Sequence, residues 1–282
     1  MTEQSAWEAA VAPPGSSLYY SNLHLAPEKK HALLALHVLW MQLEEILHGA
    51  SDPGVGRIKL QWWREEIERA FRGEARHPTA VVLARSFSCF ALSERPFRDA
   101  IDAVDTELSH AGHPTFASLE PFLEQMGTLW ALSALINGYR DERTPDALKQ
   151  LGSACELTFL IQNLPRDMAR GRPHLPLDEA ERAEVHLDQP VNANDRDALR
   201  RFVETQAKRA SERLQESLER LPARDRLFQL HSLILGNVYR ATLQEIAKDG
   251  FRVGEHHIAL TPLRKLWIGW STRRKETVRS RR

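Results

Sequence analysis

Apolar residues recur three and four positions apart along most of this chain, which is the spacing of one face of an α-helix. The pattern predicts a short helix from Ser16 to Pro27 and longer helices over 28–48, 58–72, 77–91, 94–109, 116–136, 145–164, 193–221, 227–247 and 260–270. In 28–48 apolar side chains cover nearly the whole circumference, so we expect this helix at the centre of the fold. Between 172 and 190 we expect a loop with a short helix.

No stretch alternates apolar and polar residues over a useful length, and no internal repeat is present. The sequence therefore predicts an all-α fold, a single-domain helical bundle around a central cavity. Residues 1–15 are expected to be a flexible leader, 16–270 the helical domain and 271–282 a basic tail. That tail, which contains Arg273, Arg274, Lys275 and Arg279, either contacts an anionic membrane surface or is a solvated, frayed end.

Composition narrows the function classes. The 282 residues contain 38 Lys plus Arg and 38 Asp plus Glu, so overall charge gives no reason to expect a nucleic-acid partner. Two distant cysteines fit a reducing compartment. No run of about 18 apolar residues marks a membrane span, and the N-terminus does not resemble a signal peptide. We therefore expect a cytoplasmic protein, with possible contact to the inner membrane face through the tail.

Two short polar groups stand out because each ends an apolar helical run. Asn163 and Asp167 are four residues apart, so on an unbroken helix they share one face. Glu44, Glu45 and His48 form the second group. Two such groups facing each other at the mouth of a helical bundle are able to hold metal ions against a diphosphate.

The segment LGSACELTFLIQNLPRDMARGRPHLP, residues 151–176, resembles the squalene/phytoene synthase family. That family carries its second aspartate motif in a segment similar to LGxAxQLTNILRDVxEDxxRGRxYLP, which aligns here without a gap. Residues 16–40, 52–80 and 239–267 also resemble the opening helices, the helix after the first aspartate motif and the closing helices of the family. The likeness covers about residues 15–268.

The resemblance implies a helical bundle in which two prenyl diphosphates, such as farnesyl or geranylgeranyl diphosphate, bind through Mg²⁺ and are joined head to head. It places Glu44, Glu45, His48, Asn163 and Asp167 around the metal, with Glu44 and Asp167 as the catalytic pair. It places five further residues near substrate: Arg170, Arg172, Gln162, Tyr239 and His37. The residues leave open whether NADPH takes part.

The chain departs from the family pattern at the motifs themselves. Four carboxylates become two, because the first pair is Glu44 and His48 and the second is Asn163 and Asp167. Histidine is a poor ligand for Mg²⁺, which selects hard oxygen donors. Gln162 and Met41 stand where the family has arginines. Pro165 lies between Asn163 and Asp167, where a kink would turn them apart.

Most of these residues also have an ordinary structural explanation. Glu44 and Glu45 fit the solvated end of a helix, where a histidine such as His48 is favoured by the helix dipole. Asp167 fits an ion pair with Arg166 or Arg170. Arg170 and Arg172 fit anchors for the loop that follows, and His37 and Tyr239 fit core positions.

Two hypotheses follow. The first is a prenyltransferase of the squalene/phytoene synthase type. The second is a catalytically impaired relative that binds a lipid or a protein partner, in the manner of a mitochondrial complex I assembly factor that resembles the same family with eroded aspartate motifs.

Overall fold

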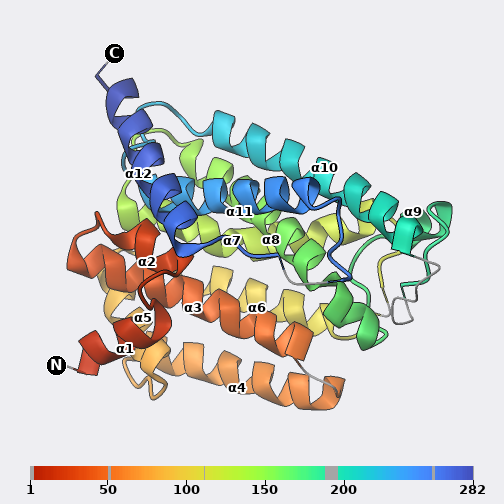
Figure 1. Ribbon diagram of the computed structural model, residues 1–282. Coiled ribbons are helices and arrows are strands. Elements are labelled where there is room, and N and C mark those ends of the chain that lie inside the picture. The colour runs from red at the N-terminus through yellow and green to blue at the C-terminus, as the bar shows by residue number, and fades with distance from the viewer. Residues whose placement is uncertain (1–2, 50–51, 111, 188–195, 256–257, 282) are drawn as a thin grey trace.

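The computed structural model describes residues 3–49, 52–110, 112–187, 196–255 and 258–281. Within these ranges the chain forms helices and no β-strand (Figure 1). The helices are α1 Glu3–Val11, α2 Ser17–Asn22, α3 Pro27–Gly49, α4 Pro53–Phe71, α5 Pro78–Cys89, α6 Arg95–Glu107, α7 Phe116–Asn137, α8 Thr144–Ala169, α9 Leu177–Arg182, α10 Arg196–Arg220, α11 Leu230–Lys248 and α12 Pro262–Arg279. The predicted all-α class is confirmed.

The helix starts follow from local chemistry. Pro53, Pro78 and Pro262 each lie in the first turn of a helix, where a missing N–H costs nothing and the fixed φ suits the helix. Asp52 accepts a hydrogen bond from the Gly54 backbone at the start of α4. Pro165 does not end α8, which continues to Ala169. The kink expected there does not separate the helix into two segments.

Helices α7 and α8 pack closely side by side through the middle of the molecule, with α3 and α6 on one side and α10 and α11 on the other (Figure 1). Two glycines make this close approach possible. A Cβ atom at Gly127 would lie 2.4 Å from the carbonyl oxygen of Lys149, and one at Gly152 would lie 2.5 Å from Trp130. Any larger residue at either position would push α7 and α8 apart.

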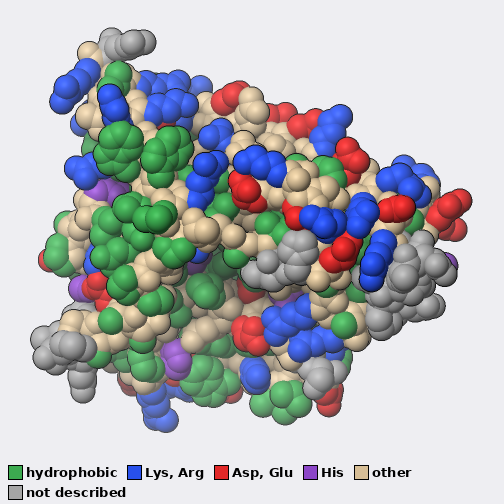
Figure 2. Space-filling view, viewed as in Figure 1, with side chains coloured by type: hydrophobic (Ala, Val, Ile, Leu, Met, Phe, Trp, Pro, Cys, Tyr) green, Lys and Arg blue, Asp and Glu red, His purple; other side chains and the backbone are tan. Residues whose placement is uncertain are grey.

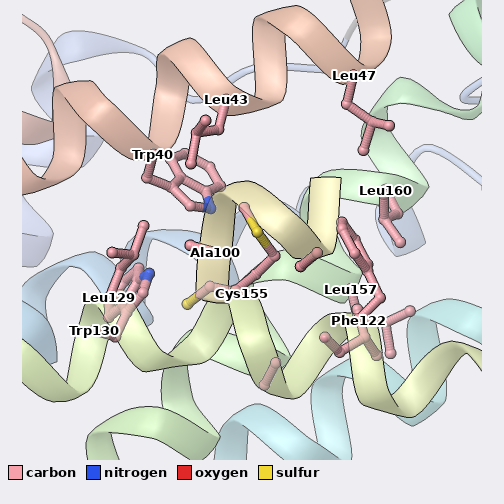
Figure 3. Close-up of a cluster of buried hydrophobic side chains, with 14 of the residues drawn as sticks. Trp40, Leu43, Leu47, Ala100, Phe122, Leu129, Trp130, Cys155, Leu157 and Leu160 are labelled. Atoms are coloured by element: carbon pink, nitrogen blue, oxygen red, sulfur yellow. The ribbon is translucent and has the colours of Figure 1, made fainter. Parts of the chain in front are cut away.

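Helix α3 has the central position that its apolar pattern predicts. Residues 32–36 are all buried, so every side of the helix is covered at that level. Further along, Trp40 and Leu43 extend from α3 toward Trp130 on α7 and Cys155 on α8 (Figure 3). The helix then ends beside the C-terminal half of α8, and this places the two candidate motifs near each other.

The division into a leader, a helical domain and a basic tail stays a prediction. Within the leader, α1 packs on the core through Trp7 and Val11, and Ala12 is buried. Most of the tail lies in α12, which runs to Arg279 and is anchored by a buried ion pair between Arg226 and Glu276 with a shortest separation of 2.7 Å. Arg282 and residues 1–2 lie outside the described residues.

One face of α12 exposes large apolar side chains, among them Leu263, Trp267 and Trp270. Figure 2 shows apolar side chains gathered over α12 and the N-terminal helices, with arginines and lysines around them. Among the described residues, no helix is both long enough and apolar enough to cross a bilayer.

Candidate functional site

The two candidate motifs meet at the ends of α3 and α8, where His48 lies between two carboxylates. Its Nδ1 is 2.7 Å from Asp167 Oδ1, and its Nε2 is 3.1 Å from Glu44 Oε2. All three side chains are almost completely buried. Burial alone lowers the pKa of His48, but the hydrogen bonds to Asp167 and Glu44 outweigh it and raise that pKa to about 10. The imidazole is therefore held as a cation between two anions.

A third buried carboxyl continues this network into the core. Glu156 accepts a hydrogen bond from the indole N–H of Trp40 at 2.8 Å. Its other oxygen, Oε1, and Oε1 of Glu44 are both buried without a hydrogen-bond partner. Burial, followed by the negative charge of Glu44, raises the pKa of Glu156 well above its usual value. The neutral form of Glu156 is therefore favoured in the folded protein.

A fourth buried carboxyl, Glu107, lies on the other side of His48. Glu107, at the end of α6, accepts from His113 at 2.9 Å and from His174 Nδ1 at 2.6 Å. Burial raises the pKa of Glu107, but the hydrogen bonds from His113 and His174 lower it to about 2 overall. The His174 ring stands perpendicular to the His48 ring, with 5.3 Å between the centroids. The two histidines thus connect α3, α6 and the loop after α8.

Beside this network is a cavity of about 760 Å³, which α1, α2, α3, α8, α11 and α12 line. Four aromatic side chains, His37, Trp40, Phe159 and Tyr239, form part of its lining. Trp40 packs edge-on against Phe159, with 5.0 Å between the ring centroids. Burial lowers the pKa of His37 to about 4 and raises that of Tyr239 well above its usual value. Both side chains are therefore neutral at pH 7, which suits an apolar ligand.

His37 and Tyr239 therefore lie both on core helices and on the wall of a cavity. A core position and a place near a ligand, the two alternatives predicted for them, are thus compatible. Glu44 also lines this cavity, whereas His48 and Asp167 lie behind it. A solvated helix end is consequently the wrong explanation for Glu44, which is 1% exposed.

The remaining predicted metal residues do not join the buried network. Glu45 is exposed and forms an ion pair with Arg166, with a shortest separation of 3.1 Å. Asn163 is only partly buried, and its amide donates to the Phe159 carbonyl on the same helix at 3.0 Å. Gln162 points elsewhere, with its amide 3.4 Å from the Ile258 carbonyl.

The arginines that follow α8 lie away from the cavity lining. Arg170 is exposed, and Arg172 is partly buried with contacts of its own. Neither Arg166 nor Arg170 pairs with Asp167, as the ordinary structural explanation expected, because Asp167 turns inward to His48. Arg166 lines the cavity rim instead, together with Lys265.

Sequence reasoning missed four members of the buried network, namely Glu107, His113, Glu156 and His174. Two of them carried a signal in the family pattern quoted above, because Glu156 stands where the pattern has glutamine and His174 where it has tyrosine. Glu107 carried none, since it ends an ordinary amphipathic helix and only the tertiary structure brings it to His174.

A model of the squalene/phytoene synthase family matches residues 11–266. The chain belongs to this family. The family serves isoprenoid biosynthesis and acts on prenyl diphosphates. Among curated relatives, a 15-cis-phytoene synthase of Synechocystis is 23% identical over 274 residues, with 92% of this chain and 81% of the relative covered.

A chloroplastic phytoene synthase of Arabidopsis thaliana is 26% identical over 245 residues. That alignment covers 83% of this chain but 57% of the plant protein, so the chain spans little more than half of its length. Among solved structures, a dehydrosqualene synthase in complex with a ligand superposes with a TM-score of 0.79 at 18% identity, covering 98% of this chain and 96% of the other. A squalene synthase from Alicyclobacillus acidocaldarius gives a TM-score of 0.67 at 20% identity, covering 88% and 93%. These superpositions confirm the fold.

The family typically depends on a divalent metal. Whether Mg²⁺ fits this chain depends on the ligand atoms that the motif residues offer. Mg²⁺ takes oxygen ligands in near-octahedral geometry at about 2.0–2.1 Å. Here an imidazole lies between Glu44 and Asp167, the Asn163 amide is bonded to its own helix, and Glu45 faces Arg166. This donor set does not fit a magnesium cluster.

Proposed function

We propose that this protein binds a prenyl diphosphate, or another isoprenoid of similar length, in the cavity beside α3. The observation that carries the proposal is the cavity itself, since about 760 Å³ of space is bounded by His37, Trp40, Phe159 and Tyr239. Ligand cavities of about 300–1,000 Å³ with mostly apolar walls are typical of small-molecule sites. Family membership supports an isoprenoid as the occupant.

A diphosphate group would sit at the rim of this cavity, where Arg166 and Lys265 supply positive charge. Arg166 is at present paired with Glu45 in an exposed position. Such surface pairs contribute little, about 0–1 kcal/mol, so a phosphate is able to replace the carboxylate at small cost. Arg170 and Arg172, which the family resemblance placed near phosphate, are proposed as secondary contacts only.

The chemical step is a separate part of the proposal. Since the motif residues do not fit a magnesium cluster, we assign no ionisation step to Mg²⁺ in this chain. The function supported best is isoprenoid binding by a family member impaired in metal-dependent head-to-head condensation.

Head-to-head prenyl transfer is the second candidate, and one observation favours it. The side chains of Glu44 and Asp167 come from two different helices and converge on the same imidazole. Convergence of this kind is what a shared cation between two diphosphates would require. The candidate needs His48 to move out of this position.

The experiment measures binding and turnover separately. Titration with farnesyl S-thiolodiphosphate, followed by tryptophan fluorescence, reports binding near Trp40. Met41→Trp places a large side chain in the cavity lining at a half-exposed position, and we expect at least a tenfold loss of affinity. Ile58→Trp, on the exposed surface of α4, is the matched control and should bind as the wild type does.

The same preparations are then incubated with farnesyl or geranylgeranyl diphosphate and Mg²⁺. A C30 or C40 hydrocarbon product would establish the transferase. Binding without product would establish an isoprenoid-binding relative. Absence of both binding and product would refute the proposed function.

We also propose that α12 contacts an anionic membrane surface. Leu263, Trp267 and Trp270 are spaced to share one helix face, and Arg264 and Arg274 lie over the two indole rings at 5.8 and 5.3 Å. Exposed tryptophans bordered by basic residues are typical of helices that lie at the membrane interface. Lys265 of the same helix lines the cavity, so a membrane contact here would bring an isoprenoid near its opening.

A further inference from the structure

We propose that His48, Asp167 and His174 form a binding site for a divalent transition-metal ion, of which Zn²⁺ is the best fit. One ligand atom from each of the three buried side chains lies within 4.8 Å of the others. The inference goes beyond the proposed function, because it concerns the cluster behind Glu44 and not the isoprenoid cavity.

The distances suit one ion. His48 Nδ1 and Asp167 Oδ1 are 2.7 Å apart, and the two imidazole rings are perpendicular with centroids 5.3 Å apart. Zinc binds nitrogen and oxygen ligands at about 2.0–2.2 Å, so neighbouring ligands of one ion lie about 3–4 Å apart. Small rotations of the side chains therefore bring the three ligand atoms around a common centre.

Each histidine also has a carboxylate on its other nitrogen. His174 Nδ1 is 2.6 Å from Glu107 Oε1, which leaves Nε2 for a metal. His48 Nε2 is 3.1 Å from Glu44 Oε2, and a metal bound at Nδ1 would replace the proton that Nδ1 now shares with Asp167. Metal-binding histidines almost always donate their second ring N–H to a carboxylate or carbonyl, which fixes the ring and makes the ligand more basic. This independent observation distinguishes the cluster from an ordinary buried ion pair.

The donor set selects the class of metal. Two imidazole nitrogens and one carboxylate suit Zn²⁺, Fe²⁺ or Mn²⁺, whereas Mg²⁺ prefers oxygen ligands throughout. Two substitutions relative to the family pattern build the set, because His174 stands where the pattern has tyrosine and His48 where the first motif has aspartate. The chain has thus replaced the donors of a magnesium motif with those of a transition-metal site.

The test is the metal content of the full-length chain after removal of any affinity tag. Inductively coupled plasma mass spectrometry should find about one zinc, iron or manganese ion per chain, either as purified or after refolding with Zn²⁺. Replacement by Co²⁺ should give the visible absorption of a cobalt ion bound to nitrogen and oxygen. His174→Gln should abolish stoichiometric binding, and Glu107→Gln should weaken it by about 10–100-fold.

His113→Gln is the matched control. His113 is equally buried and donates to the same Glu107, but it is not a member of the cluster. Retained metal in His113→Gln with loss in His174→Gln supports the site. Equal loss in both variants would show that the histidines only support folding, and a metal-free wild type that also fails to take up Zn²⁺ or Co²⁺ on refolding would overturn the proposal. Isoprenoid binding is not part of either measurement, so failure here leaves the proposed function untouched.

Discussion

His48 Nδ1 lies 2.7 Å from the carboxylate of Asp167, although the two residues are 119 positions apart in the chain. This contact joins the C-terminal ends of α3 and α8 inside the bundle. It also replaces the arrangement of carboxylates around Mg²⁺ that the family resemblance implied.

Removal of one partner should destabilise the fold strongly, because it leaves a buried charge without compensation. We expect His48→Ala and Asp167→Ala each to lower the free energy of unfolding by about 3–5 kcal/mol. Urea unfolding of the two single variants and the double variant gives their coupling energy. Glu45→Ala, which breaks the exposed pair with Arg166, should cost at most about 1 kcal/mol. Similar losses for Glu45→Ala and Asp167→Ala would contradict the buried ion pair.

Glu156 should make the protein less stable as the pH rises. Its pKa is raised in the folded state, so its contribution to stability is fully present below the pKa of the unfolded chain, about 4.5, and is lost at higher pH. Glu156→Gln keeps the hydrogen bond to Trp40 and removes the titration. The variant should therefore resemble the wild type at pH 4 and be more stable than it at pH 8. Parallel stability curves for the two proteins would show that Glu156 is ionised in the fold.

His37 should have the opposite pH dependence. Its pKa of about 4 in the folded state is below the ordinary value of 6.5. The unfolded chain therefore takes up a proton first as the pH falls below 6.5, and by pH 4 this costs about 3 kcal/mol of stability. NMR titration of the His37 ring should give the low pKa directly, and His37→Leu should reduce the loss of stability in acid. A ring that titrates near pH 6.5 would contradict burial in the cavity wall.

The exposed tryptophans of α12 should govern binding to membranes. We expect Trp267→Ser with Trp270→Ser to reduce co-sedimentation with vesicles that contain phosphatidylglycerol, and high salt to reduce binding by the wild type, because basic residues near an anionic surface contribute about 1 kcal/mol each. Ile58→Ser, at a more exposed apolar position on α4, should have no effect. Binding that is insensitive to both changes would rule out this face as the contact.

Much of the fold was predictable because helix formation here is a local property. The apolar periodicity of residues 28–48 and 116–136 gave α3 and α7 nearly to their ends, and the segment around Asp167 resembled the right family. The errors occurred where local signals conflicted with packing. Pro165 suggested a break that the packing of α8 tolerates, and α12 continues nine residues past its predicted end at Trp270.

The candidate site was less predictable, and the reason is physical. The sequence by itself determined which side chains stand at the motif positions and that two carboxylates had been lost there. Only the tertiary structure decided that Glu44 and Asp167 both bond to His48, that Glu45 turns outward to Arg166, and that Glu107 bonds to His174 beside them. A residue's helix follows from its neighbours in sequence, whereas its charge state and partners follow from burial among helices that are distant in the chain.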